Sequence, residues 1–117
     1  AMGFCVAEAL KAAELLEKEG IQARVLDMFC VKPLDETAVI RAAQETGAVV
    51  TAENHNVING LGSAVADVLA SACWAPLEKV GVQDEFGEVG PVDYLQERCG
   101  LTAQAICEKA KKAIARK

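Results

Sequence analysis

The stretch AVVTAENHNVINGLGS, residues 48–63, decides the fold class. It opens with five uncharged, small or β-branched residues, 48–52, as expected of a strand covered on both faces of a sheet. The polar segment Glu53–Asn59 follows and is predicted to be a loop. Gly60-Leu61-Gly62-Ser63 then opens a helix, with apolar residues at helical spacing up to Ala72. A buried strand, a polar loop and a helix in this order indicate an α/β protein.

The chain before residue 48 continues the same alternation. Residues 4–19 place apolar side chains at helical spacing, and Gly20 follows where a left-handed C-cap is needed. Gln22–Met28 is rich enough in branched residues for a strand. A second helix is predicted from an N-cap at Asp35 to about Thr46.

The chain after residue 63 adds a third strand, predicted over Leu77–Val82. A polar loop over 83–90 follows, then a short helix with Pro91 as its first residue and a last helix capped by Thr102. Alternation of strands and helices implies parallel strands with helices on both faces. We therefore expect a three-layer α/β/α fold with a mostly parallel sheet, in a single domain over residues 1–117.

The composition of the chain argues against several classes of function. The 117 residues are 52% hydrophobic and carry a net charge of −5, which argues against a nucleic-acid or anionic-membrane surface. No stretch approaches the roughly 20 apolar residues of a membrane span. The five cysteines form no C-x-x-C pair, so neither a zinc knuckle nor a redox dithiol is encoded. Scattered free cysteines favour a reducing compartment, and we expect a cytoplasmic protein.

Ligands of parallel α/β sheets bind beyond the carboxyl ends of the strands. The candidate segments there are Phe29–Leu34, Glu53–Asn59 and Gln83–Gly90. Glycines before a helix N-terminus can bring free N–H groups to an anion such as a phosphate or carboxylate. In the alternative interpretation, the glycines serve only to form a tight turn, and the polar groups face a neighbouring domain. The candidate residues for either role are Glu53, His55, Asn56, Gly60, Gly62 and Ser63.

Other chemistries find less support. The dinucleotide fingerprint fails because position 65 is Val, and the Lys-Ser/Thr pair of a P-loop is missing. His55 could serve as a general base or pair with a cysteine, but no flanking signature supports either role. Glu53, His55, Asp84 and Glu85 could surround a metal, although their spacing specifies none. With no complete catalytic set, the chain fits a binding, structural or regulatory module better than a self-sufficient enzyme.

Several segments together resemble the C-terminal domain of transketolase, especially the separately encoded C-terminal subunit of split bacterial and archaeal enzymes of the thiamine diphosphate-dependent superfamily. The matching segments are Ala1-Met2-Gly3, 9–14, 24–28, Val31-Lys32-Pro33-Leu34-Asp35, 51–56, Gly60–Ala66, Val80–Glu88 and Gly100-Leu101-Thr102. Lys-Pro-Leu-Asp and Gly-x-Gly-Ser-Ala-Val are shared with 1-deoxyxylulose-5-phosphate synthase. His55-Asn56 with Gly60–Ser63 looks more like transketolase.

The resemblance implies a non-catalytic structural or assembly domain of an enzyme that transfers a two-carbon ketol unit from a ketose phosphate to an aldose phosphate in the pentose phosphate pathway. Thiamine diphosphate and a divalent metal, Mg or Ca, bind to other domains of such enzymes. The chain alone is therefore expected to be inactive, with no catalytic, cofactor or metal residue of its own. The implied partners are the thiamine-binding domains or subunit, in a homodimer or heterotetramer.

Two alternatives stay open. One is a regulatory domain that binds an anionic metabolite between Glu53 and Ser63, and the other is the C-terminal domain of 1-deoxyxylulose-5-phosphate synthase or a related thiamine enzyme. The family's domain also contains a strand ending in Ala-Thr-Gly, of which only Ala1-Met2-Gly3 is present. We therefore expect an incomplete sheet and a longer intact protein that continues before Ala1.

Overall fold

A computed structural model describes residues 1–117 and contains two strands and five helices. In chain order these are α1 (Cys5–Lys18), α2 (Glu36–Thr46), β1 (Val49–Asn56), α3 (Leu61–Ala72), β2 (Leu77–Val82), α4 (Val92–Arg98) and α5 (Ala103–Ile114). None of the helices is both long and apolar enough to cross a bilayer.

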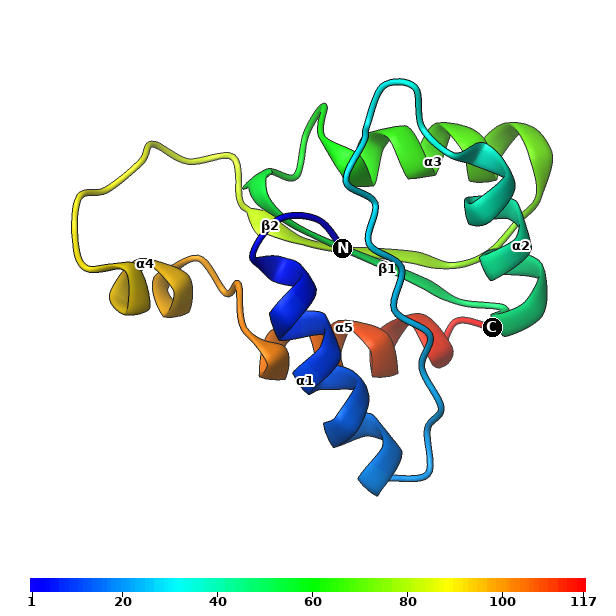
Figure 1. Ribbon diagram of the computed structural model, residues 1–117, viewed down its shortest axis with the longest axis horizontal. Helices are drawn as coiled ribbons and strands as arrows, with labels where there is room; N and C mark the ends of the chain where they lie inside the picture. Colours follow the sequence, from blue (N-terminus) through cyan, green and yellow to red (C-terminus); the bar gives the residue numbers. More distant parts are fainter.

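The two strands lie side by side and parallel, with Val49 opposite Leu77 and Ala52 opposite Val80. Helices cover both faces of this sheet: α2 and α3 lie on one side, and α1 and α5 on the other (Figure 1). Two apolar cores result, one between the sheet and each helical layer. The predicted α/β/α arrangement with parallel strands is thus confirmed.

The helix boundaries follow the predicted capping residues. Asp35 Oδ1 accepts a hydrogen bond from Ala38 N at 3.0 Å, and Thr102 Oγ1 accepts one from Ala105 N at 3.2 Å. Gly47 closes α2 with φ +74°, in the left-handed region that glycine adopts without strain. One boundary differs: Pro91 has ψ 148° and is the extended N-cap of α4, so the helix starts one residue later than predicted.

The prediction of a strand at Gln22–Met28 is wrong: this segment belongs to no strand. None of the backbone N–H groups of residues 22–27 donates a hydrogen bond within the chain. A strand forms only beside a partner, and Ala1 alone forms backbone hydrogen bonds with this segment. Ala1 N donates to Leu26 O at 2.9 Å and Met28 N donates to Ala1 O at 2.8 Å. The sheet is incomplete, as expected from the sequence.

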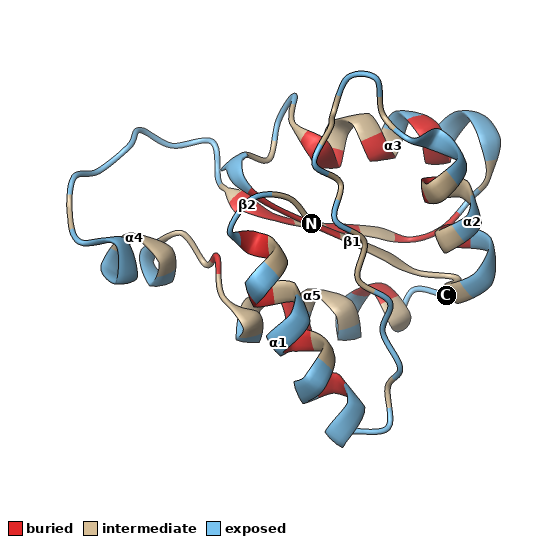
Figure 2. Cartoon of the chain, viewed as in Figure 1, coloured by how far each residue is buried: buried red, intermediate tan, exposed pale blue.

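Strand β1 is longer than predicted. It runs to Asn56 because its second half follows β2 after an irregularity, which places Asn56 opposite Val82. Glu53 and His55 therefore belong to the strand rather than to a loop. Figure 2 shows the result: the two strands carry buried residues, whereas the segment after β2 is exposed.

Candidate functional site

The carboxylate of Glu53, a residue of β1, caps the N-terminus of α3. Its side chain is 1% exposed, with Oε2 accepting from Leu61 N at 2.7 Å and Oε1 accepting from Gly62 N at 2.9 Å. The N-cap residue Gly60 offers no side chain for this purpose. The first N–H groups of a helix attract an anion, and here the anion is an internal carboxylate.

The glycines of the sequence motif make this close approach possible. A Cβ atom on Gly60 would lie 2.0 Å from Glu53 Oε2, and a Cβ on Gly62 would lie 2.8 Å from Thr51 Oγ1. Neither position has room for a side chain. The two glycines thus bring α3 down onto the end of β1, so that the carboxylate of Glu53 reaches the helix.

His55 has a different environment, with its side chain 59% exposed. Its Nδ1 lies 2.8 Å from Asn56 O and 3.8 Å from Glu53 Oε2. Nε2 has no hydrogen-bond partner within the chain, so it is available to a group on another molecule. No base–nucleophile pair forms here.

Asn56 connects the end of β1 to the segment after β2. Its Nδ2 donates to Asp84 Oδ1 at 3.0 Å, while its Oδ1 accepts from Ile58 N at 2.8 Å. Ser63 Oγ, on the first turn of α3, accepts from Asn59 N at 2.9 Å. All six predicted residues therefore lie at one place, where β1 ends and α3 begins.

Two residues of this cluster were given no such role by the sequence analysis. Lys79 Nζ donates to Val57 O and Ser63 Oγ, both at 3.4 Å, and Asp84 holds Asn56. The signal for Lys79 was present: Glu78 and Lys79 are adjacent charges inside the predicted strand Leu77–Val82. For Asp84, only the fold reveals which residue it meets.

The segment 83–98, which we call the arm, extends from this cluster and away from the three layers (Figure 1). Phe86, Val89 and Val92 are 102%, 99% and 73% exposed. Within the arm, Arg98 forms ion pairs with Glu85 at 3.0 Å and Glu88 at 3.4 Å. The charges of the arm thus pair with one another while its apolar side chains face solvent, and exposed apolar side chains of this kind are typical of a protein–protein contact surface.

The described residues do not fit the thiamine diphosphate and metal site of the enzymes that the sequence resembles. No three His, Cys, Asp or Glu side chains gather as metal ligands. The four candidates named from the sequence do not assemble, because Glu53 caps α3 and Glu85 pairs with Arg98. The helix N-terminus that could receive a phosphate already holds the Glu53 carboxylate.

The cysteines show no sign of a nucleophile. All five are free, and Cys5 and Cys107 are buried. Burial raises the pKa of Cys5 to about 11 and also raises the pKa of Cys107. A reactive thiol needs the opposite shift.

Comparison with known proteins shows to which family the chain belongs. The family model "Transketolase, C-terminal domain" matches residues 1–106. The chain belongs to the transketolase C-terminal domain family. A solved structure described as a split gene transketolase, inactive β4 tetramer, superposes on this transketolase C-terminal domain with a TM-score of 0.93 and 51% sequence identity, covering 97% of this chain and 37% of that one.

Curated relatives of this transketolase C-terminal domain include both enzymes that the sequence resembles, transketolase and 1-deoxyxylulose-5-phosphate synthase. A 6-deoxy-6-sulfo-D-fructose transketolase subunit from Clostridium sp. (strain MSTE9) is 57% identical over 117 residues, which are 100% of this chain and 36% of that protein. A 1-deoxy-D-xylulose-5-phosphate synthase from Heliobacterium modesticaldum is 40% identical over 112 residues, 95% of this chain and 17% of that protein. The chain thus spans about a third or less of the length of these relatives.

Proposed function

We propose that the chain is the non-catalytic assembly domain of a split transketolase and docks onto the domains that bind thiamine diphosphate and a divalent metal. The complete enzyme transfers a two-carbon ketol unit between sugar phosphates. One contrast at the carboxyl edge of the sheet carries the proposal. The internal carboxylate of Glu53 fills the position for a small anion, whereas Phe86 and Val89 of the arm are fully exposed.

The arm and the site cluster have the composition of a docking surface. Protein interfaces place aromatic and aliphatic side chains at the centre and polar groups at the rim. Burying one such side chain contributes about 1.5–3 kcal/mol. Phe86 and Val89 would form the apolar centre, and His55 Nε2 would contribute a polar contact beside it. The hydrogen bond between Asn56 and Asp84 connects the two parts.

The relatives favour transketolase over the synthase as the parent enzyme. Identity is 57% to the transketolase subunit and 40% to the synthase over nearly the same residues. We take a ketose phosphate as the donor, in the pentose phosphate pathway. The name of the Clostridium relative points to a second donor class, a ketose with a sulfonate, which is also a terminal anionic group.

The proposed partner is the polypeptide that carries the thiamine-binding domains, in a homodimer or heterotetramer. The β4 tetramer named for the solved relative supports association between subunits of this kind. We also propose a cytoplasmic location, because none of the five cysteines forms a disulfide.

The test is the dissociation constant between this chain and the polypeptide that carries the thiamine-binding domains. The double variants Phe86→Ala/Val89→Ala and His55→Ala/Asn56→Ala should each weaken binding, the first by at least about 30-fold, as expected when interface anchors are truncated. Trp74→Ala is the matched control, because Trp74 is 78% exposed but precedes β2, at the opposite edge of the sheet. Equal affinity of the arm variant and the control would reject the docking surface.

The regulatory alternative has its own measurement. Calorimetric titration of the isolated chain with inorganic phosphate and with a sugar phosphate should give no saturable heat, because Glu53 occupies the helix N-terminus. Saturable binding that is lost in His55→Ala/Asn56→Ala, with assembly unchanged in that variant, would favour the metabolite-binding function instead.

A further inference from the structure

The arm carries most of the net charge of the chain. It contains five acids and one base, which give it a charge of −4, whereas the whole chain has a charge of −5. The acids, all of them exposed, are Asp84, Glu85, Glu88, Asp93 and Glu97. The rest of the chain is therefore nearly neutral, and the acidic character of the protein is concentrated on one projecting segment (Figure 1).

Three of the five carboxylates have no cationic partner within the chain. Asp84 Oδ1 accepts from the uncharged amide of Asn56 at 3.0 Å. Asp93 and Glu97 lie four residues apart, on the same side of α4, and their side chains form neither a hydrogen bond nor an ion pair. An unpaired carboxylate is stable in water but not in a dry contact. A molecule that covers this side of the arm therefore has to supply positive charge.

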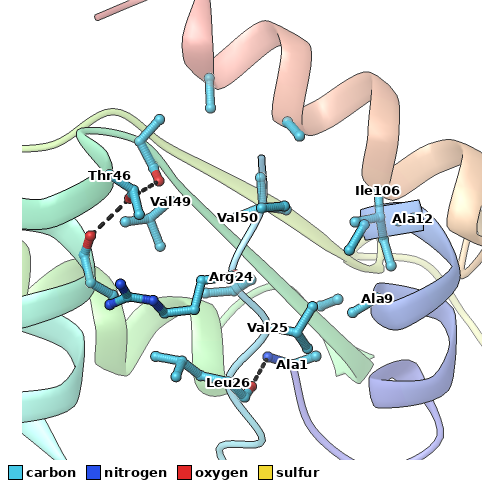
Figure 3. Close-up of a pocket in the computed structure, with 18 of the residues that line it drawn as sticks. Ala1, Ala9, Ala12, Arg24, Val25, Leu26, Thr46, Val49, Val50 and Ile106 are labelled. Atoms are coloured by element: carbon cyan, nitrogen blue, oxygen red, sulfur yellow. Dashed lines mark hydrogen bonds between the residues drawn. The ribbon is translucent and has the colours of Figure 1, made fainter. Parts of the chain in front are cut away.

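The apolar side chains beside these acids are not covered by the chain itself. Phe86, Val89 and Val92 are 102%, 99% and 73% exposed. The large apolar pocket of the chain, of about 440 Å³, is lined by residues between 1 and 65 and between 106 and 117, and by none of the arm (Figure 3). A surface that covers the apolar side chains of the arm therefore belongs to another molecule.

We propose that the arm binds in a groove of the polypeptide that carries the thiamine-binding domains, and that this groove has an apolar floor and a rim of arginine and lysine side chains. The proposal rests on the assembly function and adds the chemistry of the partner surface. The floor covers Phe86 and Val89, and the basic rim faces Asp93 and Glu97. Arginine is enriched at interfaces and binds a carboxylate through two parallel hydrogen bonds, so it suits the rim best.

Charge complementarity favours a basic groove over a neutral or acidic one. Like charges that meet across an interface weaken binding, and a neutral groove would leave the carboxylates unpaired. A basic groove attracts the arm over distances comparable with the Debye length, about 10 Å at 0.1 M ionic strength, and so raises the association rate. The apolar floor then supplies most of the affinity, whereas the charges supply the rate and the orientation of encounter.

A second copy of this chain offers a less suitable surface. Its basic segment is the end of α5, where Lys109, Lys112 and Arg116 form ion pairs with Glu78 at 3.2, 3.3 and 2.6 Å. Glu78 is buried, so cations that turned away to bind an arm would leave a buried carboxylate unpaired, which is unfavourable. Two arms placed side by side would repel each other, because both are acidic.

The test is the association rate constant between this chain and the polypeptide that carries the thiamine-binding domains, at about 50 mM and about 500 mM NaCl. Asp93→Lys/Glu97→Lys should slow association at least about 10-fold at low salt, and the difference from the unmodified chain should shrink to less than about 2-fold at high salt. Recovery at high salt also shows that the variant is folded. Asp93→Asn/Glu97→Gln should give an intermediate rate at low salt.

Glu14→Lys/Glu17→Lys is the matched control. It makes the same change in net charge as the arm variant, on exposed residues of α1 that form no ion pair, and should alter the rate by less than about 3-fold. Equal rates for the arm variant and this control at low salt would overturn the basic groove, and faster association of the arm variant would show an acidic groove instead.

Two further measurements separate this proposal from the assembly function. If charge reversal had no effect but Phe86→Ala/Val89→Ala still weakened binding, the basic groove would be rejected while docking by the arm would stand. If neither variant had an effect, the assembly function would fail as well. Sedimentation of the isolated chain at low salt should show a monomer, and a dimer that disappears in Asp93→Lys/Glu97→Lys would identify a second copy as the occupant and overturn the proposal.

Discussion

Replacing Glu53 by alanine should destabilise the chain more than any other single change at the site. The substitution leaves Leu61 N and Gly62 N without the carboxylate that they contact at 2.7 and 2.9 Å. A buried N–H group that loses its partner costs about 1–3 kcal/mol. Two such groups at a helix N-terminus give an expected loss of about 3–5 kcal/mol in the free energy of unfolding. Glu53→Gln should lose about half as much, because one amide oxygen can still accept.

Urea denaturation measures this loss. With a slope of about 1–3 kcal/mol per molar urea, the midpoint of Glu53→Ala should fall by about 1–5 M. Glu14→Ala is the matched control, because Glu14 is exposed on α1 and makes no hydrogen bond, so its midpoint should stay nearly constant. Added acetate should partly restore Glu53→Ala but not affect the unmodified chain. A Glu53→Ala midpoint within error of the control would refute the capping role.

Three further outcomes follow from the structure. Glu78 is buried, which raises its pKa, but hydrogen bonds from Lys109, Arg116 and Lys112 outweigh this and hold the pKa below its ordinary value. The ionised Glu78 side chain therefore stabilises the fold above the unfolded-state pKa of about 4.3, and this stabilisation is lost as pH falls through the lower folded-state pKa. In Glu78→Gln, the free energy of unfolding should therefore fall less steeply as the pH is lowered. Mass spectrometry after brief iodoacetamide treatment at pH 8 should find Cys30, Cys73 and Cys99 alkylated before the buried Cys5 and Cys107, and early modification of Cys5 would contradict its burial. Asp35→Ala should lower the free energy of unfolding by about 1 kcal/mol through loss of the bond from Ala38 N, with Asp35→Asn as the variant that retains it.

Local sequence signals predicted the helices well. Asp35, Gly47 and Thr102 act through neighbours within four residues, so their roles as caps can be predicted without the fold. The parallel pairing of β1 and β2 was also predictable, because the predicted strands alternate with helices along the chain.

The failures have a common cause, which is dependence on distant partners. Gln22–Met28 has the composition of a strand, but only Ala1 forms backbone hydrogen bonds with it. The site residues were found as a group, whereas the capping of α3 by Glu53 was not foreseen, because it depends on how closely Gly60 and Gly62 approach the end of β1. The exposure of Phe86 likewise follows from the position of the arm, which composition does not encode.

Ketol transfer by the separated and recombined parts tests the central claim most directly. The rate of transfer from a ketose phosphate to an aldose phosphate should be measured for this chain alone, for the polypeptide that carries the thiamine-binding domains alone, and for their mixture, each with thiamine diphosphate and Mg²⁺. The account predicts no turnover by this chain alone, turnover by the mixture, and a loss of that turnover in Phe86→Ala/Val89→Ala that excess variant chain restores. Robust ketol transfer by the isolated chain would contradict the assembly role.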